Sequence, residues 1–137
     1  MTRALFLLLL SPILVAAGDL EQGQFTRCKG SHRVTCVVDG DTFWFEGRKI
    51  RISDINTPEI SRPDCRREAE LGEQATQRLT VLLNSGPFTL MRDGRDTDRY
   101  GRELRVLVRD GQSLGEMLVA EGLAERWQGR RGNWCAA

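Results

Sequence analysis

Four short polar segments carry most of the residues in this chain that are suited to chemistry. They are Asp39-Gly40-Asp41-Thr42, the single Arg51, Asn56-Thr57-Pro58-Glu59, and Asp98-Arg99-Tyr100-Gly101-Arg102. Carboxylate and carbonyl oxygens are the ligands that Ca²⁺ and Mg²⁺ prefer. Arginine binds phosphoryl oxygens in a bidentate manner, and a carboxylate beside a metal ion can orient and deprotonate water. These residue types together indicate metal-assisted chemistry on a phosphorylated substrate.

Each segment taken alone is also compatible with a purely structural role. An Asp-Gly-Asp sequence between two strands is typical of a hairpin turn. Thr57-Pro58-Glu59 is typical of a loop that ends a strand, and a single arginine on a strand face is usually solvated. The functional interpretation therefore requires a fold that brings the four segments together.

The elements between these segments predict such a fold. Period-2 patterns predict strands over 33–38, 42–46, 49–55, 87–92 and 104–109, and helical spacing predicts helices over 66–84 and 113–122. The order is three strands, a helix, two strands and a helix. It predicts a mainly β protein with helices (α+β), built as a five-stranded, partly open Greek-key barrel of the OB type with two to three helices. In this order the first hairpin, the end of the third strand and the start of the fifth can meet on one side.

The start of the chain has the pattern of a secretory signal peptide. Arg3 precedes an apolar run over residues 4–15, and Ala16 and Ala17 suit cleavage. The run is shorter than the roughly 20 apolar residues of a membrane-spanning helix. We therefore expect a signal peptide over 1–17, a polar N-terminal arm over 18–32 and one domain over 33–137. The mature form is expected to be secreted or periplasmic, without a membrane partner.

The charge balance does not predict attraction to nucleic acid as a whole. The chain has 20 basic and 19 acidic residues, and removal of Arg3 with the signal leaves 19 of each. All basic residues except Lys29 and Lys49 are arginines. This bias favours local phosphate recognition, although a general compositional bias explains it equally well.

The cysteine count predicts disulfides. An even number behind an export signal indicates two bridges among Cys28, Cys36, Cys65 and Cys135. Three pairings are possible, and we expect Cys28–Cys36 together with Cys65–Cys135. A zinc site is the alternative, and the absence of any C-x₂-C spacing disfavours it.

The polar segments in their order resemble the thermonuclease (staphylococcal nuclease-like) family. The matching stretches are 37–42, 51–59, 98–102 and 118–124, so the resemblance covers residues 33–124. It implies an OB-fold, Ca²⁺-dependent phosphodiesterase. Such an enzyme cuts DNA and RNA with little sequence preference and leaves 3′-phosphorylated products.

The resemblance also implies metal ligands. Asp41 and the backbone carbonyl of Thr57 would bind the cation, and Asp39 would shape the hairpin behind them. The family usually has aspartate at the position of Asn56. An amide oxygen still binds calcium, but the lost negative charge predicts weaker binding. Asp54, two residues earlier on the same strand face, is a candidate to compensate through a bridging water, or is simply exposed to solvent.

The remaining implied roles concern the reaction itself. Glu59 would hold the attacking water, as general base or as the group that orients it. Arg51 and Arg102 would bind the non-bridging oxygens as charge develops in the transition state. Arg99 and Tyr100 would lie near the substrate phosphate and sugar.

The C-terminal tail contains a second basic and aromatic group, made of Arg126, Trp127, Arg130, Arg131 and Trp134. Arginine interleaved with tryptophan suits phosphate contact and base stacking on single strands. An anchored tail, however, also buries its aromatic residues against the domain. Both interpretations remain open at this stage.

Two functions are compatible with these observations. The first is an exported nuclease acting on DNA and RNA as a monomer. The second is a nucleic-acid-binding or interaction module of the OB type with weak or no catalysis, an alternative suggested by Asn56. An OB fold alone does not separate the two, because it hosts many functions.

Overall fold

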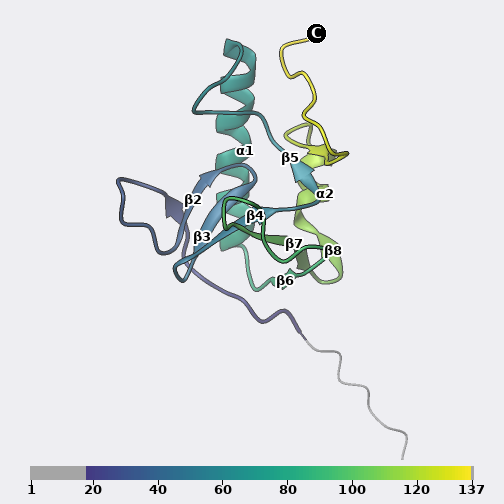
Figure 1. Ribbon diagram of the computed structural model, residues 1–137. Helices are drawn as coiled ribbons and strands as arrows, with labels where there is room; N and C mark the ends of the chain where they lie inside the picture. Colours follow the sequence, from purple (N-terminus) through teal and green to yellow (C-terminus); the bar gives the residue numbers. More distant parts are fainter. Residues whose placement is uncertain (1–17, 137) are drawn as a thin grey trace, which may run out of the picture.

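The computed structural model describes residues 18–136 (Figure 1). The expected signal peptide, 1–17, lies outside the described residues. Two helices, α1 (Arg66–Asn84) and α2 (Leu114–Ala120), lie among short strands. The strands are β1 (Thr26–Arg27), β2 (Cys36–Asp39), β3 (Thr42–Phe45), β4 (Arg48–Ile52), β5 (Ile55–Asn56), β6 (Thr89–Met91), β7 (Glu103–Arg109), β8 (Gln112–Ser113) and β9 (Glu125–Arg126).

The main sheet has the strand order β1-β2-β3-β4-β7-β6, with β8 added beside β7. Strands β2, β3 and β4 form the expected antiparallel meander, and β4 then pairs in parallel with β7. Within the described residues the end strands β1 and β6 do not pair, so the sheet is curled but not closed into a barrel. The α+β, OB-like class is confirmed. Besides the strands expected from the sequence, the fold contains additional strands of two residues each.

Helix α1 forms where the apolar spacing predicts it and covers the inside of the sheet. Cys65 is its N-cap, because the Cys65 sulfur accepts a hydrogen bond from the Glu68 N–H. Leu79 and Leu83 of α1 are fully or almost fully buried and belong to one core with Phe43 and Ile50 of the sheet. Each such side chain contributes about 1.5–3 kcal/mol when it is removed from water. This packing fixes the distance between α1 and the first hairpin.

Part of the expected polar arm packs onto the domain. Phe25 is only 3% exposed, and its backbone N–H and carbonyl are both bound by the Asn84 side chain at the end of α1. The next residues form β1, which pairs in parallel with β2. The sequence pattern did not predict this strand, because two residues show no periodicity.

Both disulfides occur in the expected pairing. Cys28–Cys36 links the arm to β2, and Cys65–Cys135 links the start of α1 to the C-terminal tail. In Figure 1 the tail accordingly runs beside the end of α1 at which the helix begins. No cysteine in residues 18–136 is free, which leaves no thiolate for a zinc site.

A second, two-stranded sheet connects the middle of the chain to the tail. In it β5 pairs antiparallel with β9, with Ile55 opposite Arg126 and Asn56 opposite Glu125. Sequence periodicity did not predict β9, and this pairing brings the start of the tail to the segment that contains Asn56. Among the described residues, neither helix has the length and apolar character needed to cross a bilayer.

Candidate active site

The β2–β3 hairpin places Asp41 at the edge of the core. Gly40 is required there, because a Cβ atom would lie 2.7 Å from the Ala75 Cβ on α1 and 2.9 Å from the Thr57 side chain. Asp41 is 7% exposed, and its carboxylate accepts hydrogen bonds from the Thr57 N–H at 3.0 Å and the Thr42 hydroxyl at 3.0 Å. The hairpin is therefore fixed against the segment that follows β5.

Arg51 points from β4 toward this carboxylate. Its guanidinium lies 3.3 Å from the Asp41 Oδ2 and donates to the Ile55 carbonyl at 2.8 Å, with a further contact to the Ile52 carbonyl. The Arg51 side chain is 13% exposed, and the Trp127 ring centroid lies 6.0 Å away. The planar group is thus held in one orientation, as bidentate recognition of an anion requires.

Asn56 and Thr57 are buried beside Asp41, with 2% and 3% exposure. Thr57 contacts Asp41 directly through its N–H. The Asn56 side chain is oriented by the tail, because its Nδ2 donates to the Glu125 Oε1 at 2.9 Å. Glu125 was not predicted from the sequence, and only the β5–β9 register places it here.

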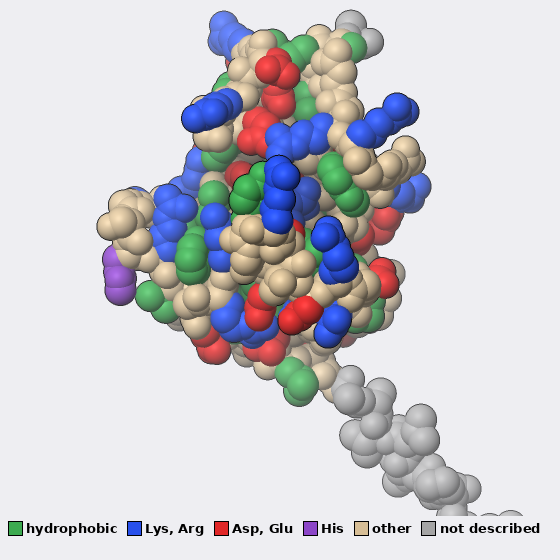
Figure 2. Space-filling view, viewed as in Figure 1, with side chains coloured by type: hydrophobic (Ala, Val, Ile, Leu, Met, Phe, Trp, Pro, Cys, Tyr) green, Lys and Arg blue, Asp and Glu red, His purple; other side chains and the backbone are tan. Residues whose placement is uncertain are grey.

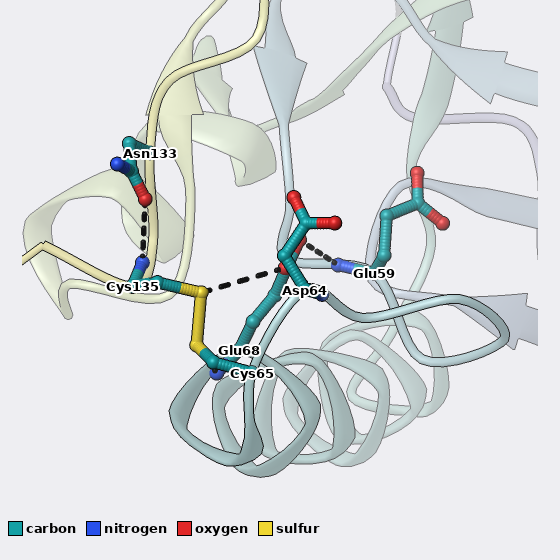
Figure 3. Close-up of a disulfide and its surroundings, with 6 residues drawn as sticks. All are labelled: Glu59, Asp64, Cys65, Glu68, Asn133 and Cys135. Carbon is teal, nitrogen blue, oxygen red and sulfur yellow. Dashed lines mark hydrogen bonds between the residues drawn. A yellow bond between two sulfur atoms is a disulfide. The ribbon is translucent and has the colours of Figure 1, made fainter.

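The loop that carries Glu59 is held by a buried acidic residue, Glu68, in the first turn of α1. The Glu68 carboxylate accepts the Glu59 N–H at 3.2 Å and the Asp64 N–H at 2.8 Å (Figure 3). The Cys65–Cys135 disulfide lies on the other side of the same carboxylate, with the Cys135 sulfur 4.0 Å from it (Figure 3). Glu68 is 6% exposed and lies on the buried face of α1, seven residues before Ala75 and eleven before Leu79.

The Glu59 side chain, 28% exposed, is paired with the tail residue Arg131, whose guanidinium donates to Glu59 Oε1. The Cys65–Cys135 disulfide anchors the tail four residues beyond Arg131. From the sequence, Arg131 was recognised only as part of the tail group. Its charge and its position near a cysteine were the available signals, and neither identifies Glu59 as its partner.

The polar segment 98–102, which precedes β7, is organised by Asp98. Its carboxylate accepts the Tyr100 and Arg102 N–H groups and pairs with the Arg102 guanidinium at 2.7 Å. Arg99 donates to the Tyr100 hydroxyl at 2.6 Å, and both Arg99 and Arg102 lie over the Tyr100 ring, at 4.8 and 5.4 Å from its centroid. Tyr100 itself is 68% exposed and available for stacking.

Arg51, the polar loop before β7 and the tail line one open cleft of about 430 Å³. Arg51 and Ser53 line it from the end of β4 and the residue after it, and Trp127 and Arg131 line it from the tail. The loop before β7 and the start of β7 contribute the remaining residues: Asp93, Arg95, Asp98, Arg99, Tyr100, Arg102 and Leu104. Figure 2 shows many Lys and Arg side chains over one face of the molecule, with acidic groups among them. The concentration of arginine at the cleft gives a local preference for anions that the balanced total charge does not.

The acidic residues Asp41 and Glu59 do not line the cleft themselves, but each is paired with an arginine that does. Arg51 contacts Asp41 and lines the cleft, and Arg131 contacts Glu59 and lines it too. Burial raises the pKa of Asp39 to about 7, and the neighbouring Asp41 carboxylate and, to a lesser degree, Glu59 add to this rise. The Asp41 N–H donates to Asp39 Oδ1 at 3.2 Å, so these two carboxylates adjoin within the hairpin.

The residue types at and next to Asp41 suit a hard cation. Asp41, the Asn56 amide and the Thr57 carbonyl are oxygen donors from adjoining segments, which suits Ca²⁺ or Mg²⁺ better than softer metals. Within residues 18–136 no cluster of three or more His, Cys, Asp or Glu side chains has metal-binding geometry. A cation here would depend on neutral oxygen donors as much as on carboxylates.

Asp54 and the tail tryptophans, whose roles the sequence leaves open, have distinct environments. Asp54 accepts a hydrogen bond from the Ser113 hydroxyl at 2.7 Å and lies against Gly115 of α2, and burial raises its pKa. It is therefore engaged with α2. In the tail, Trp127 is 42% exposed and lines the cleft, whereas the indole N–H of Trp134 is buried without a partner.

Comparison with known proteins agrees with this geometry. The chain is 39% identical over 93 residues to a Bacillus subtilis (strain 168) protein named Endonuclease YncB, covering 64% of this chain and 44% of that protein. It is 40% identical over 93 residues to SPbeta prophage-derived endonuclease YokF of the same organism, covering 64% of this chain and 31% of that protein. The chain thus spans less than half the length of these relatives. The profile of the family described as staphylococcal nuclease homologue matches residues 49–133, and this chain belongs to that family.

Proposed function

We propose that the protein is an exported, Ca²⁺-dependent nuclease that hydrolyses phosphodiester bonds of DNA and RNA with low sequence specificity and leaves 3′-phosphorylated products. The observation that carries this proposal is that Arg51 and Arg102 line the same cleft, and that Arg51 also lies 3.3 Å from the Asp41 carboxylate behind it. Two arginines beside fixed oxygen donors suit a phosphodiester in its transition state. Family membership and the names of the two endonuclease relatives support the same activity.

In the proposed mechanism the substrate phosphate lies between Arg51 and Arg102. Their guanidinium groups bind the non-bridging oxygens and stabilise the negative charge that develops on them. Tyr100 and Trp127, both exposed at the cleft, are suited to stack against neighbouring sugars or bases. Stacking is tolerant of sequence, which agrees with low specificity.

Glu59 is proposed to accept the proton of the attacking water. The water oxygen forms a bond to phosphorus, and the bond from phosphorus to the 5′ oxygen breaks. That oxygen takes up a proton from solvent, and Glu59 afterwards releases its proton to solvent. The Glu59 carboxylate must exchange its contact with Arg131 for a contact with water, and Glu68 holds the backbone of the loop meanwhile.

Asp41, the Thr57 carbonyl and the Asn56 amide oxygen are the residues proposed to hold the calcium ion, with Asp39 behind them. When bound, the ion supplies positive charge that stabilises the transition state and lowers the pKa of bound water. Export is proposed from the pattern of residues 1–17, and the two disulfides are compatible with an oxidising compartment. A monomer is the expected state.

Digestion of single-stranded DNA and of RNA by the purified protein, with millimolar calcium and then with chelator, tests this proposal. We expect fragments that form only with calcium and carry 3′-phosphate ends. Treatment with a phosphatase that removes 3′-phosphates identifies these ends. The Glu59→Gln variant is the control for a contaminating nuclease. Equal digestion by the wild type and this variant would contradict the assignment.

A binding module with weak or no catalysis is the second candidate. It is favoured by the neutral Asn56, which stands where the family resemblance implies an aspartate. The same samples separate the two functions. Retention of nucleic acid in the presence of chelator, with no cleavage at any calcium concentration, would support the binding module.

A further inference from the structure

The buried Asn56 side chain has one specific partner in the tail, Glu125. The two residues are directly opposite in the β5–β9 ladder, so their side chains lie on the same face. Asn56 is 2% exposed, and its Nδ2 donates to Glu125 Oε1 at 2.9 Å. The Gly132 N–H donates to the same Oε1 atom at 2.6 Å. A side chain at position 132 would clash with Glu125, because a Cβ there would lie 2.1 Å from Oε2.

We propose that Glu125 is a positioning residue for the metal site: it fixes the orientation of the Asn56 amide and supplies the negative charge that position 56 lacks. This inference rests on the proposed Ca²⁺-dependent function. An amide has a donor end and an acceptor end, and an ionised carboxylate can only accept. Because Glu125 binds the donor end, the acceptor oxygen of Asn56 is directed away from Glu125, where it can serve a cation.

The charge argument gives Glu125 a second role. Substitution of aspartate by asparagine removes one negative charge from the ligand set, and ligand charge is a main determinant of calcium affinity. Glu125 returns a negative charge one hydrogen bond from the amide. Asp54, the compensating group considered from the sequence, is bound to Ser113 instead. Groups that hold a metal ligand typically change metal affinity by about 10–100-fold when they are mutated.

This pairing reverses a simple expectation about position 56. From charge count alone, Asn56→Asp should strengthen calcium binding. With Glu125 in place, the new carboxylate would face a second carboxylate across a contact of 2.9 Å, buried and without the donor that now joins them. Like charges in direct opposition on a sheet are destabilising. The full benefit of an aspartate at position 56 therefore requires a change at position 125.

Calorimetric titration of Ca²⁺ into the full-length mature protein tests this inference without any activity measurement. The variants are Glu125→Gln, Asn56→Asp and the double variant with both changes. Glu121→Gln is the matched control, because it removes the same charge from an exposed residue that pairs with Arg78. We expect Glu125→Gln to weaken calcium binding by roughly 10-fold or more, Asn56→Asp to bind no more tightly than wild type, and the double variant to bind more tightly than either single variant.

The results separate the inference from the function on which it rests. If wild type binds calcium but Glu125→Gln and Glu121→Gln have unchanged affinities, or if Asn56→Asp alone binds more tightly, the role of Glu125 is refuted and the proposed function stands. If wild type binds no calcium, the proposed metal dependence is wrong, and this inference fails with it. Circular dichroism checks folding. In the double variant the Gln amide at position 125 can donate to the Asp carboxylate at position 56, so this hydrogen bond is kept with its direction reversed. The double variant therefore still tests the inference if a single variant does not fold.

Discussion

Removal of the Cys65–Cys135 disulfide should affect both stability and the active site. The replacement of both cysteines by serine is the appropriate change, because Cys65 is the N-cap of α1 and serine is also a good N-cap. The two cysteines are 70 residues apart. In the chain-entropy model, the cross-link of a loop this long stabilises the native state by about 4.4 kcal/mol.

The other disulfide provides a matched control. Cys28 and Cys36 are only 8 residues apart, and the same model gives about 2.5 kcal/mol for this bridge. Neither residue lines the cleft or contacts Asp41, Arg51 or Glu59. The Cys28→Ser/Cys36→Ser variant should therefore lose less stability and should retain its activity when assayed below its unfolding transition.

The Cys65→Ser/Cys135→Ser variant, in contrast, should lose activity even where it is fully folded. The disulfide anchors the tail, whose Trp127 and Arg131 line the substrate cleft, and its Cys135 sulfur lies 4.0 Å from the Glu68 carboxylate that holds the Glu59 loop. Without this disulfide, the one described interaction that holds the Arg131 side chain is its exposed ion pair with Glu59. Such pairs contribute at most about 1 kcal/mol, which is too little to keep the tail in place. Urea unfolding followed by tryptophan fluorescence gives the stabilities, and digestion of single-stranded DNA gives kcat/KM. Equal kcat/KM in the two double variants, or a greater loss of stability in the Cys28–Cys36 variant, would refute this reasoning.

Further predictions concern single groups of the site. Glu59→Gln should lower kcat by about 10²–10⁴-fold with substrate binding retained, because it removes the proposed proton acceptor; an unchanged kcat excludes Glu59 from the chemistry. Arg51→Lys should lower kcat by roughly 100-fold, since lysine cannot bind two oxygens at once, whereas Arg126→Lys, on an exposed pair with Glu116, should be neutral. Chelator should abolish cleavage and added calcium should restore it, and cleavage that persists in chelator contradicts a metal requirement. Burial acts to raise the pKa of Asp98, but hydrogen bonds with Arg102 outweigh it and lower this pKa below 3.8. The pair therefore stabilises the protein above pH 3.8, and this contribution is lost as the pH falls below that value. Asp98→Asn should accordingly lose less unfolding free energy than wild type as the pH is lowered through and below 3.8.

Local features of the fold followed from residues close together in the chain. Helix α1 begins at Arg66 and ends at Asn84, as its leucine spacing predicted, because one apolar stripe is enough to define an amphipathic helix. The hairpin at Gly40 and the cap at Ser113 are equally local. Periodicity, caps and turns each depend on residues within a few positions, so the pattern of residue types is sufficient to predict them.

Buried acidic residues were harder to predict. Glu68 lies on the buried face of α1, seven residues before Ala75 and eleven before Leu79, but an acidic residue adds nothing to an apolar pattern. It is buried because it binds the backbone of the Glu59 loop. Its place three residues after the N-cap was a usable signal, since an acidic side chain there often reaches back to the preceding backbone. Strand β9 had no comparable signal, because two residues do not define a period.

Residue types and their order were enough to predict the family and the chemistry proposed for it, with carboxylates, arginines and a general-base candidate in one pattern. The fold class followed from the same residues, since alternation and helical spacing define which faces are buried. Only the tertiary structure decided that Glu125 faces Asn56, 69 positions away, and that Arg131 meets Glu59, 72 positions away. Such pairs depend on strand register and on a disulfide that joins distant segments, and neither leaves a repeating pattern in the sequence.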